Sequence, residues 1–498
     1  MTATPDILTK VISTVIGIFS PQKAMTYRAQ RIALRNYAAG KMDGANAQWY
    51  PTTKTADEDY LPDKQRIINR CRDTAKNDMF VSGAINKICT NVVRNGQKFQ
   101  ANILRRNGKP ADTLNEKIES ELTPAVKGAA LDITGHDSIY ALQRLILRSC
   151  WIDGQVFIRR VWVPGSHFGF KLKLLKSDRL DDSKSGPMPN GNVSIGGIEF
   201  FPDSMEPAGY HFVQTILQNS YSFRYDSVRY DAKDIIHVWN REEVEDQTQG
   251  VPWIVAIVME AFELKEFRRY ESIAARTAAA FAIFLKQEFP EAEVPDIWNA
   301  SSPIPKYVQP GTMQKLPWGV GIDVAKSDRP STSFAPWMDG SLQGQAAGVG
   351  LSYGNYSNNR AKSSYSAERS GTIEERFGFQ WQQGFLNEKF NFRLWEWIVE
   401  ALQIKGYPVS AGEHAFSLEM QSDGWPWIDP KKDVEAAAME WGMGSNTLKN
   451  IMAAHGRDYQ ETKTQREKEA EDFAFLNEGN NDKKFEPTDD KEPKLQAV

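Results

Sequence analysis

The segment from Pro252 to Gln287 reads as a single, unusually long helix, because it contains no Gly or Pro after its first residue. It would be about 50 Å long at 1.5 Å per residue, whereas ordinary helices average about 11 residues. Its last part is rich in small residues, which let helices approach closely, here between subunits rather than within one chain. We therefore expect a subunit contact at Ala274, Ala278 and Ala279.

Helical periodicity also appears twice before this segment. Apolar residues recur at helical spacing from Asp63 to Asn91, and again from Ser138 to Trp151, where Asp153-Gly154 follows as a turn signal. Beyond that turn the period changes to 2, which is typical of strands. Three strand-like runs predict that residues 155–240 form a mostly antiparallel β region packed on the earlier helices: 156–163, 170–174 and 234–239. The predicted fold class is α+β, predominantly helical.

The second half of the chain alternates helices with irregular segments. Residues 288–337 are rich in Pro and read as a compact insertion, followed by a short helix from Trp337 to Val349. A polar loop without acids, Gly350 to Ser366, precedes a second long helix from about Thr372 to Lys405. One face of that helix is expected to belong to the core: Phe377, Trp381, Phe385, Phe392, Trp395, Val399 and Leu402.

Composition excludes several classes of protein. Lys and Arg total 60 against 64 for Asp and Glu, and the net charge of −4 argues against a protein that coats nucleic acid. The 3 cysteines have no CxxC spacing, which favours neither a disulfide framework nor a zinc site. The most apolar stretch, Ile7 to Phe19, is too short and too polar to span a bilayer or act as a signal peptide. It reads as a docking segment or disordered arm, with a membrane-surface element as the alternative.

Signatures of catalysis are absent. The 6 histidines lack neighbours at metal-ligand spacing, and the sequence contains no phosphate-binding loop, nucleophile elbow or dinucleotide fingerprint. The densest acidic run, Glu242 to Asp246, could serve a two-metal nuclease but is more typical of a solvated loop. From Glu461 onward the chain is almost entirely polar, and its last 20 or so residues are predicted to be disordered.

Several short motifs in colinear order resemble the lambda-type portal family of tailed bacteriophages, from about Trp49 to about Glu469. The matching segments include Arg70-Cys71-Arg72-Asp73, Trp151-Ile152-Asp153-Gly154-Gln155-Val156-Phe157, Ser177-Asp178-Arg179-Leu180, Gly197-Ile198-Glu199, Asp234-Ile235-Ile236-His237, Gln249-Gly250-Val251-Pro252, Ala347-Gly348-Val349-Gly350-Leu351-Ser352-Tyr353, Ser364-Tyr365-Ser366-Ala367-Glu368-Arg369 and Trp425-Pro426-Trp427-Ile428-Asp429-Pro430. The chain departs from the family pattern at Gln249, where a basic residue is usual, and at Gly354, where an acid is usual.

The resemblance implies a portal fold, with wing, stem, clip and crown regions around a DNA channel. The implied parts are an N-terminal arm (1–62), an α+β wing domain (63–250), a stem helix (251–287), a clip (288–336), a second stem helix (337–349), a tunnel loop (350–371), a long helix with a return to the wing (372–424), a crown (425–475) and a disordered charged tail (476–498).

The resemblance also implies a non-enzymatic function without a cofactor. The protein would form a ring, normally of twelve copies, at one vertex of the capsid, in the virion and during assembly in the host cytoplasm. Its partners would be the major capsid protein, the terminase large subunit, a head–tail adaptor protein and double-stranded DNA, which it would contact independently of base sequence. It would not bind a membrane. The channel loop would contact DNA through Tyr353, Asn355, Tyr356, Asn358, Asn359, Arg360, Lys362 and Tyr365.

Two other functions stay open at this point. One is a metal-dependent nuclease that uses acids outside the recognised motifs. The other is a capsid-scaffold ring that never contacts DNA.

Overall fold

The computed structural model describes most of the chain between residues 53 and 472. The described ranges are 53–105, 108–218, 221–243, 246–279, 283–287, 320–324, 333–361, 363–409, 416–457 and 459–472. The chain forms two compact units, Met1–Glu58 and Asp59–Val498. The expectations for Ile7 to Phe19 and for the tail 476–498 lie outside the described residues, and the end of the predicted arm contains a short helix, α3 (Ala56–Tyr60).

The predicted helix from Asp63 to Asn91 is two helices, α4 (Lys64–Asn77) and α5 (Met79–Val93). Asp78 separates them with an extended backbone, φ −100° and ψ 125°, and its carboxylate accepts hydrogen bonds from the amides of Phe80 and Val81 at 2.9 Å. Such a side chain satisfies amides that have no partner within the helix. The periodicity continues across this break because both helices bury an apolar face in the same core.

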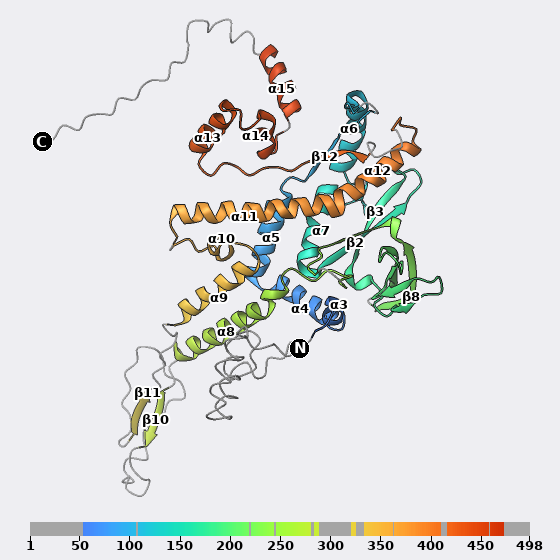
Figure 1. Ribbon diagram of the computed structural model, residues 1–498. Helices are drawn as coiled ribbons and strands as arrows, with labels where there is room; N and C mark the ends of the chain where they lie inside the picture. The colour runs from blue at the N-terminus through green and yellow to red at the C-terminus, as the bar shows by residue number, and fades with distance from the viewer. Residues whose placement is uncertain are drawn as a thin grey trace, which may run out of the picture. The chain divides into compact units, whose positions relative to one another are not determined.

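Two further helices complete this part of the structure. Helix α6 (Asp112–Lys127) was not predicted, and α7 (Ile139–Asp153) confirms the second helical segment. The hydroxyl of Ser138 caps α7, and Gly154 ends it with φ 79°, a backbone conformation that favours glycine. Helix α5 contacts α7, α10 and α11 (Figure 1).

Antiparallel sheets occupy residues 155–240, as predicted. A three-stranded sheet has the order β3-β2-β9 and pairs Phe157 of β2 with His237 of β9. A five-stranded sheet has the order β4-β5-β6-β7-β8. The strands are β2 (Gln155–Trp162), β3 (Phe170–Lys176), β4 (Gly186–Pro187), β5 (Val193–Ile195), β6 (Ile198–Phe200), β7 (Pro207–Gln218), β8 (Tyr221–Asp231) and β9 (Ile235–Trp239), with 3-10 turns η3 (Ser177–Arg179) and η4 (Ala232–Asp234).

The long helix predicted from Pro252 to Gln287 is shorter than expected. Helix α8 covers Val255–Ala279, and Ile283–Gln287 forms β10, which pairs antiparallel with β11 (Val320–Val324). The sequence Ile-Phe-Leu suits a pleated strand as well as a helix, so pairing with a distant segment decides the outcome. Residues 288–319 and 325–332 of the predicted insertion lie outside the described residues.

The second long helix begins earlier than predicted and is interrupted. It consists of α11 (Tyr365–Leu386), a π-helical turn η6 (Asn387–Asn391) and α12 (Phe392–Ile404). The expected core face is only partly buried, since Phe377 is 65% exposed and Trp381 53% exposed. Phe392 is also exposed, whereas the other four residues of the stripe, Phe385, Trp395, Val399 and Leu402, are buried as predicted.

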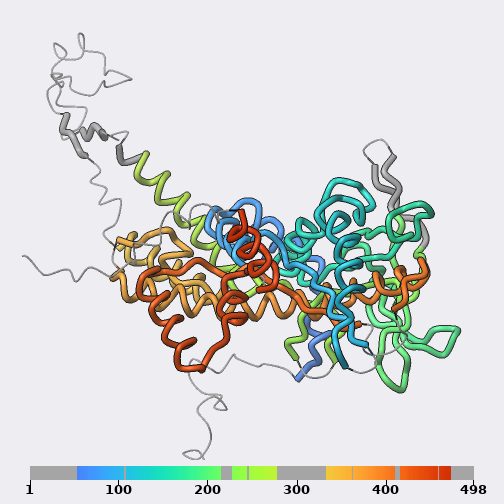
Figure 2. Tube along the Cα trace, turned by 90° about the horizontal axis from the view of Figure 1, so that it is seen from above, coloured from blue at the N-terminus to red at the C-terminus, as the bar shows by residue number. Residues whose placement is uncertain are grey.

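The remaining elements follow the same chain order. Helix α9 (Phe334–Gly348) and the short α10 (Tyr353–Ser357) precede α11, and strand β12 (Leu418–Gln421) pairs with β1 (Lys98–Ala101). Helices α13 (Pro430–Gly442), α14 (Leu448–Ala454) and α15 (Tyr459–Asp472) contain no buried residue. Seen from above, α9 and α10 lie toward one end of the long helix and the sheets toward the other (Figure 2). Among the described helices, none has the length and apolar character needed to cross a bilayer.

Candidate functional site

The predicted polar loop is more ordered than its composition suggested. It contains α10, whose N-terminus is capped by the Ser352 hydroxyl, and it reverses direction at Asn358, where φ is 58°. The Ser364 hydroxyl then caps α11. Residues 350–371 therefore form a helical turn and the start of a helix, rather than a loop throughout.

Two of the predicted channel tyrosines are held inside this structure. Tyr356 is only 3% exposed, stacks on Phe80 of α5 at 6.3 Å, and donates a hydrogen bond to the side-chain oxygen of Gln345 at 2.8 Å. Burial raises the pKa of Tyr356 above its usual value. Tyr353 is half-buried and donates to the Asp339 carboxylate at 2.7 Å. The Tyr356 ring belongs to the packing beneath the loop, and its contact with DNA stays a prediction.

Two side chains from other helices fix the shape of the loop. The buried Glu375 carboxylate of α11 accepts from the Ser352 amide and from the Asn355 side chain, both at 2.6 Å. The Lys87 ammonium group of α5 donates to the Asn355 carbonyl and the Asn358 side chain. Sequence reasoning missed Lys87, because no motif links it to a loop so distant along the chain.

The outer part of the loop presents polar groups to solvent. Asn358 and Asn359 are exposed, Tyr365 is 64% exposed, and the side chain of Arg360 is 65% exposed. Arg360 donates to the Asn355 side chain at 2.9 Å and lies 3.6 Å from the Glu368 carboxylate. These four residues remain candidates for DNA contact, and Lys362 lies outside the described residues.

The structure gives a physical reason for each departure from the family pattern. A Cβ atom at Gly354 would lie 2.3 Å from Oε1 of Glu368, so an acid here would require the Glu368 side chain to shift and would bring two carboxylates close together. Gln249 is fully buried, accepts from the Gln155 side chain at 2.8 Å and donates to the Gly196 carbonyl at 3.0 Å. The same Gln155 contacts the buried ring of His237 at 2.9 Å, so a neutral amide at position 249 completes an uncharged network.

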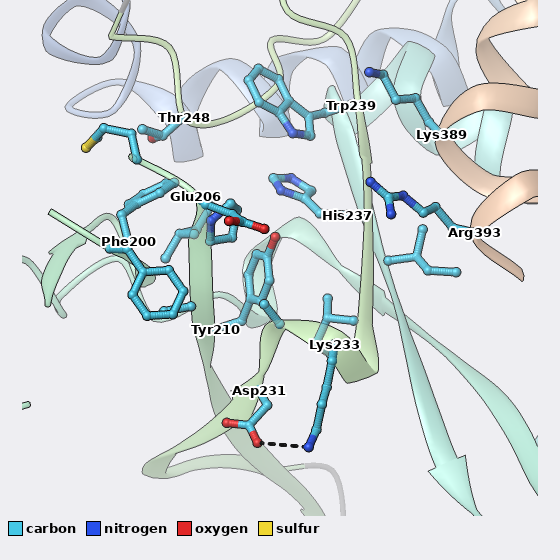
Figure 3. A pocket seen from close by; sticks show the side chains of 18 of the residues that line it. Phe200, Glu206, Tyr210, Asp231, Lys233, His237, Trp239, Thr248, Lys389 and Arg393 are labelled. Atoms are coloured by element: carbon cyan, nitrogen blue, oxygen red, sulfur yellow. Dashed lines mark ion pairs between the residues drawn. The ribbon is translucent and has the colours of Figure 1, made fainter. Parts of the chain in front are cut away.

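A separate cleft of about 1370 Å³ lies between the sheets and the helical segment from η6 to α12. Figure 3 shows Lys389 and Arg393 on the helical side, facing Tyr210, His237 and Trp239 on the strands. Burial and the nearby Lys64 hold the pKa of His237 well below its usual value, so the ring is neutral. The cleft mixes acids and bases without a nucleophile paired to a base, and its geometry supports no specific reaction.

The other candidate groups also lack a reactive arrangement. Among residues 53–472 as described, no three His, Cys, Asp or Glu side chains are placed to hold a metal ion. In the acidic run, the amides of Glu242 and Glu243 donate to the Gln247 side chain, while residues 244 and 245 are not described. The three cysteines are buried, and burial raises the pKa of Cys71 and Cys89 to about 12. Of the predicted subunit contacts, Ala274 is half-buried, and the side chains of Ala278 and Ala279 are not described.

Comparison with known proteins gives consistent results. A family model described as phage portal protein, lambda family, matches residues 43–383. The "Probable portal protein" of Halomonas phage phiHAP-1 is 25% identical over 452 residues, covering 87% of this chain and 86% of the relative. Portal protein B of Escherichia phage lambda is 21% identical over 487 residues, covering 88% of this chain and 90% of the relative.

Similar solved structures come from gene transfer agent particles. A chain from the neck of an empty particle, computed with C6 symmetry, is 13% identical with a TM-score of 0.47, covering 79% of this chain and 93% of that chain. A chain from the neck of the native particle, computed with C12 symmetry, has a TM-score of 0.46 with the same identity and coverage. Because the family model spans more than half of the sequence, this chain belongs to the lambda family of phage portal proteins.

Proposed function

We propose that this portal protein forms a ring of twelve copies at one vertex of the capsid and conducts double-stranded DNA during packaging and ejection. The family match over residues 43–383 carries the proposal, since it includes the sheets, α8, α9 and the loop with Arg360. The ring would bind the major capsid protein, dock the terminase large subunit, join a head–tail adaptor and catalyse no reaction itself. It would reside in the virion, after assembly in the host cytoplasm.

In this proposal, α8 and α9 form the stem, the β10–β11 hairpin belongs to the clip, and α13 to α15 form the crown. The exposed apolar side chains support assembly with further copies. Met259, Phe262 and Tyr270 are each at least half exposed along α8, and Phe377 and Trp381 are exposed along α11. Such rows are costly to leave in water and are typical of contacts between protein chains. In a ring, each row would be covered by a neighbouring copy.

The exposed part of the loop, Asn358, Asn359, Arg360 and Tyr365, would line the channel. Amide, hydroxyl and guanidinium groups contact phosphates without reading bases. Lys87 and Glu375 hold the base of the loop, so the exposed part would project from a fixed support.

Electron microscopy and mass measurement of the purified full-length chain test this proposal. A closed ring with a central hole and the mass of twelve chains is expected. A monomer that cleaves DNA with Mg²⁺ would favour the nuclease alternative, and a closed disc that binds no DNA would favour the scaffold alternative. Arg360→Ala should leave the ring intact and alter DNA packaging or retention, whereas unchanged retention across a range of salt would remove Arg360 from the channel contacts.

A further inference from the structure

Helices α5 and α7 form an antiparallel pair with a shared exposed face. The Arg148 side chain of α7 donates a hydrogen bond to the Asn86 side chain, near the middle of α5, at 3.0 Å. Gln143 lies earlier in α7, and its side chain accepts from the backbone amide of Gln97, which lies beyond the end of α5, at 2.9 Å. The two helices therefore run in opposite directions. The charges of Arg144 and Arg148 both act on the Cys89 thiol of α5, and Arg94 follows the end of α5. We call the face with the exposed Arg94 and Arg144 and the half-buried Arg148, together with Asn86 and Thr90, the basic strip.

The positive charge of the basic strip is not neutralised by nearby acids. Helix α5 contains no Asp or Glu, and the single acid of α7, Asp153 at its end, is paired with Arg72 at 2.7 Å. In the part of the chain that the structure describes, none of Arg94, Arg144 and Arg148 forms an ion pair. Asp423, on the linker after β12, lies 3.8 Å from the Lys98 ammonium group.

Arg94 also adopts a backbone conformation that a side chain disfavours. It follows α5 with φ 51° and ψ −120°, where glycine would be expected. Among the described residues, the guanidinium group of Arg94 has no hydrogen-bonding partner, so no contact within this part of the chain explains why an arginine occupies the position. No acceptor among the described residues therefore occupies the guanidinium group of Arg94.

We propose that the basic strip is a second contact surface for the phosphate backbone of double-stranded DNA, separate from the loop at residues 350–371. The inference depends on one part of the proposed function, namely that double-stranded DNA passes along this protein. Arg144 and Arg148 are four residues apart, or about 6 Å along the helix, and each DNA strand presents a phosphate about every 3.4 Å of its axis. Arginine, amide and hydroxyl groups together are typical of phosphate contacts that do not read sequence.

A neighbouring copy of the chain is a less suitable occupant of the strip. The centres of protein interfaces are depleted in charged residues and enriched in aromatic ones. The exposed aromatic side chains lie instead on α8 and α11, for example Phe262 and Trp381. A subunit contact at the strip would also leave three arginines without acids unless the second copy supplied them.

The test uses the purified full-length chain in its assembled form and two linear duplexes of unrelated sequence. A triple variant, Arg94→Gln with Arg144→Gln and Arg148→Gln, removes three charges but keeps long polar side chains. A control variant removes three charges from exposed residues that pair with acids elsewhere: Arg66→Gln, Arg393→Gln and Lys432→Gln. Both variants have the same net charge, so they separate local contact from the general field of the protein.

We expect the triple variant to assemble normally and to bind both duplexes at least about tenfold more weakly than the control at low salt. The slope of log affinity against log salt should become shallower by about 2 to 3, since each lost phosphate contact contributes about 0.9. Three outcomes would each overturn the inference. They are an equal loss of DNA affinity in the two variants, no DNA binding by the unmodified ring, and failure of only the triple variant to assemble. The last outcome would assign the strip to a subunit contact, whereas an unmodified chain that forms no ring would count against the proposed function instead.

Discussion

Replacing Arg94 by glycine should increase the stability of this protein while weakening its binding to DNA. Arg94 is exposed, and its φ of 51° with ψ of −120° places its Cβ in an unfavourable position. Relief of such a conformation is worth about 1 to 2 kcal/mol, and the greater freedom of glycine in the unfolded chain offsets about 0.5 to 1 kcal/mol of this. The net expected gain is about 0 to 1.5 kcal/mol in the free energy of unfolding, centred on about 0.8 kcal/mol.

Two structural details support this expected gain. The backbone amide of Arg94 donates to the Thr90 carbonyl at 2.9 Å, and glycine keeps that hydrogen bond. The charge of Arg94 also lowers the pKa of Arg376, after the larger effect of burial, so its removal relieves repulsion between like charges. The matched control is Arg94→Ala, which removes the same charge and side chain but keeps the Cβ atom.

Denaturant unfolding followed by circular dichroism, together with duplex binding at several salt concentrations, checks this prediction. Arg94→Gly should unfold at a higher denaturant concentration than Arg94→Ala, and the two variants should lose similar affinity for DNA. If Arg94→Gly were less stable than both Arg94→Ala and the unmodified protein, the backbone conformation at this position would not be the source of strain. If both variants bound DNA at full strength, Arg94 would have no role in the basic strip.

Three further changes test other parts of the structure. Gly354→Asp should lower the free energy of unfolding by about 1 kcal/mol, because the Glu368 carboxylate would have to move and would face a second negative charge. Gly378→Asp, at a position with open space, should cost less, and equal thermal midpoints would contradict crowding at position 354. Burial opposes ionisation of Glu199, but hydrogen bonds, chiefly the one from Arg229, lower its pKa to about 2. The ionised carboxylate should therefore stabilise the protein above about pH 5, and this stabilisation should be lost as the pH falls toward about 2. Urea titrations at several pH values should show a weaker pH dependence for Glu199→Gln than for the unmodified protein. Phe377→Asp should reduce ring formation in mass measurements without changing the secondary structure, and normal rings would exclude this side chain from a subunit contact.

Local patterns predicted the helices and strands that bury one face, but not where long helices end. The end of α8 at Ala279 depends on the pairing of β10 with β11, and no Gly or Pro marks it. The break at Asp78 is visible in sequence only as a capping residue within a continuous apolar pattern. Periodicity also could not predict the exposure of Phe377, because an exposed aromatic face has the same spacing in sequence as a buried one.

The sequence predicted the position of the candidate site in the chain, but it did not predict which of its side chains are buried and which are exposed. Composition identified the polar loop, yet Tyr356 and Tyr365 look equivalent in sequence, and only Phe80 and Gln345 decide that the first is buried. Lys87 carries no motif, and its role follows from the packing of α5 against α10.

The basic strip also shows how a small net charge can hide a local cationic surface. A total of −4 argues against coating, but α5 and α7 lack acids on one face, and their antiparallel packing combines their cations into one surface. Three phosphate contacts would give binding that falls steeply with salt. A duplex held this weakly could still move past the protein at physiological ionic strength, since salt screens exposed charges and the whole chain carries a net charge of −4. Local cations on an acidic protein therefore suit a channel that must guide DNA without retaining it.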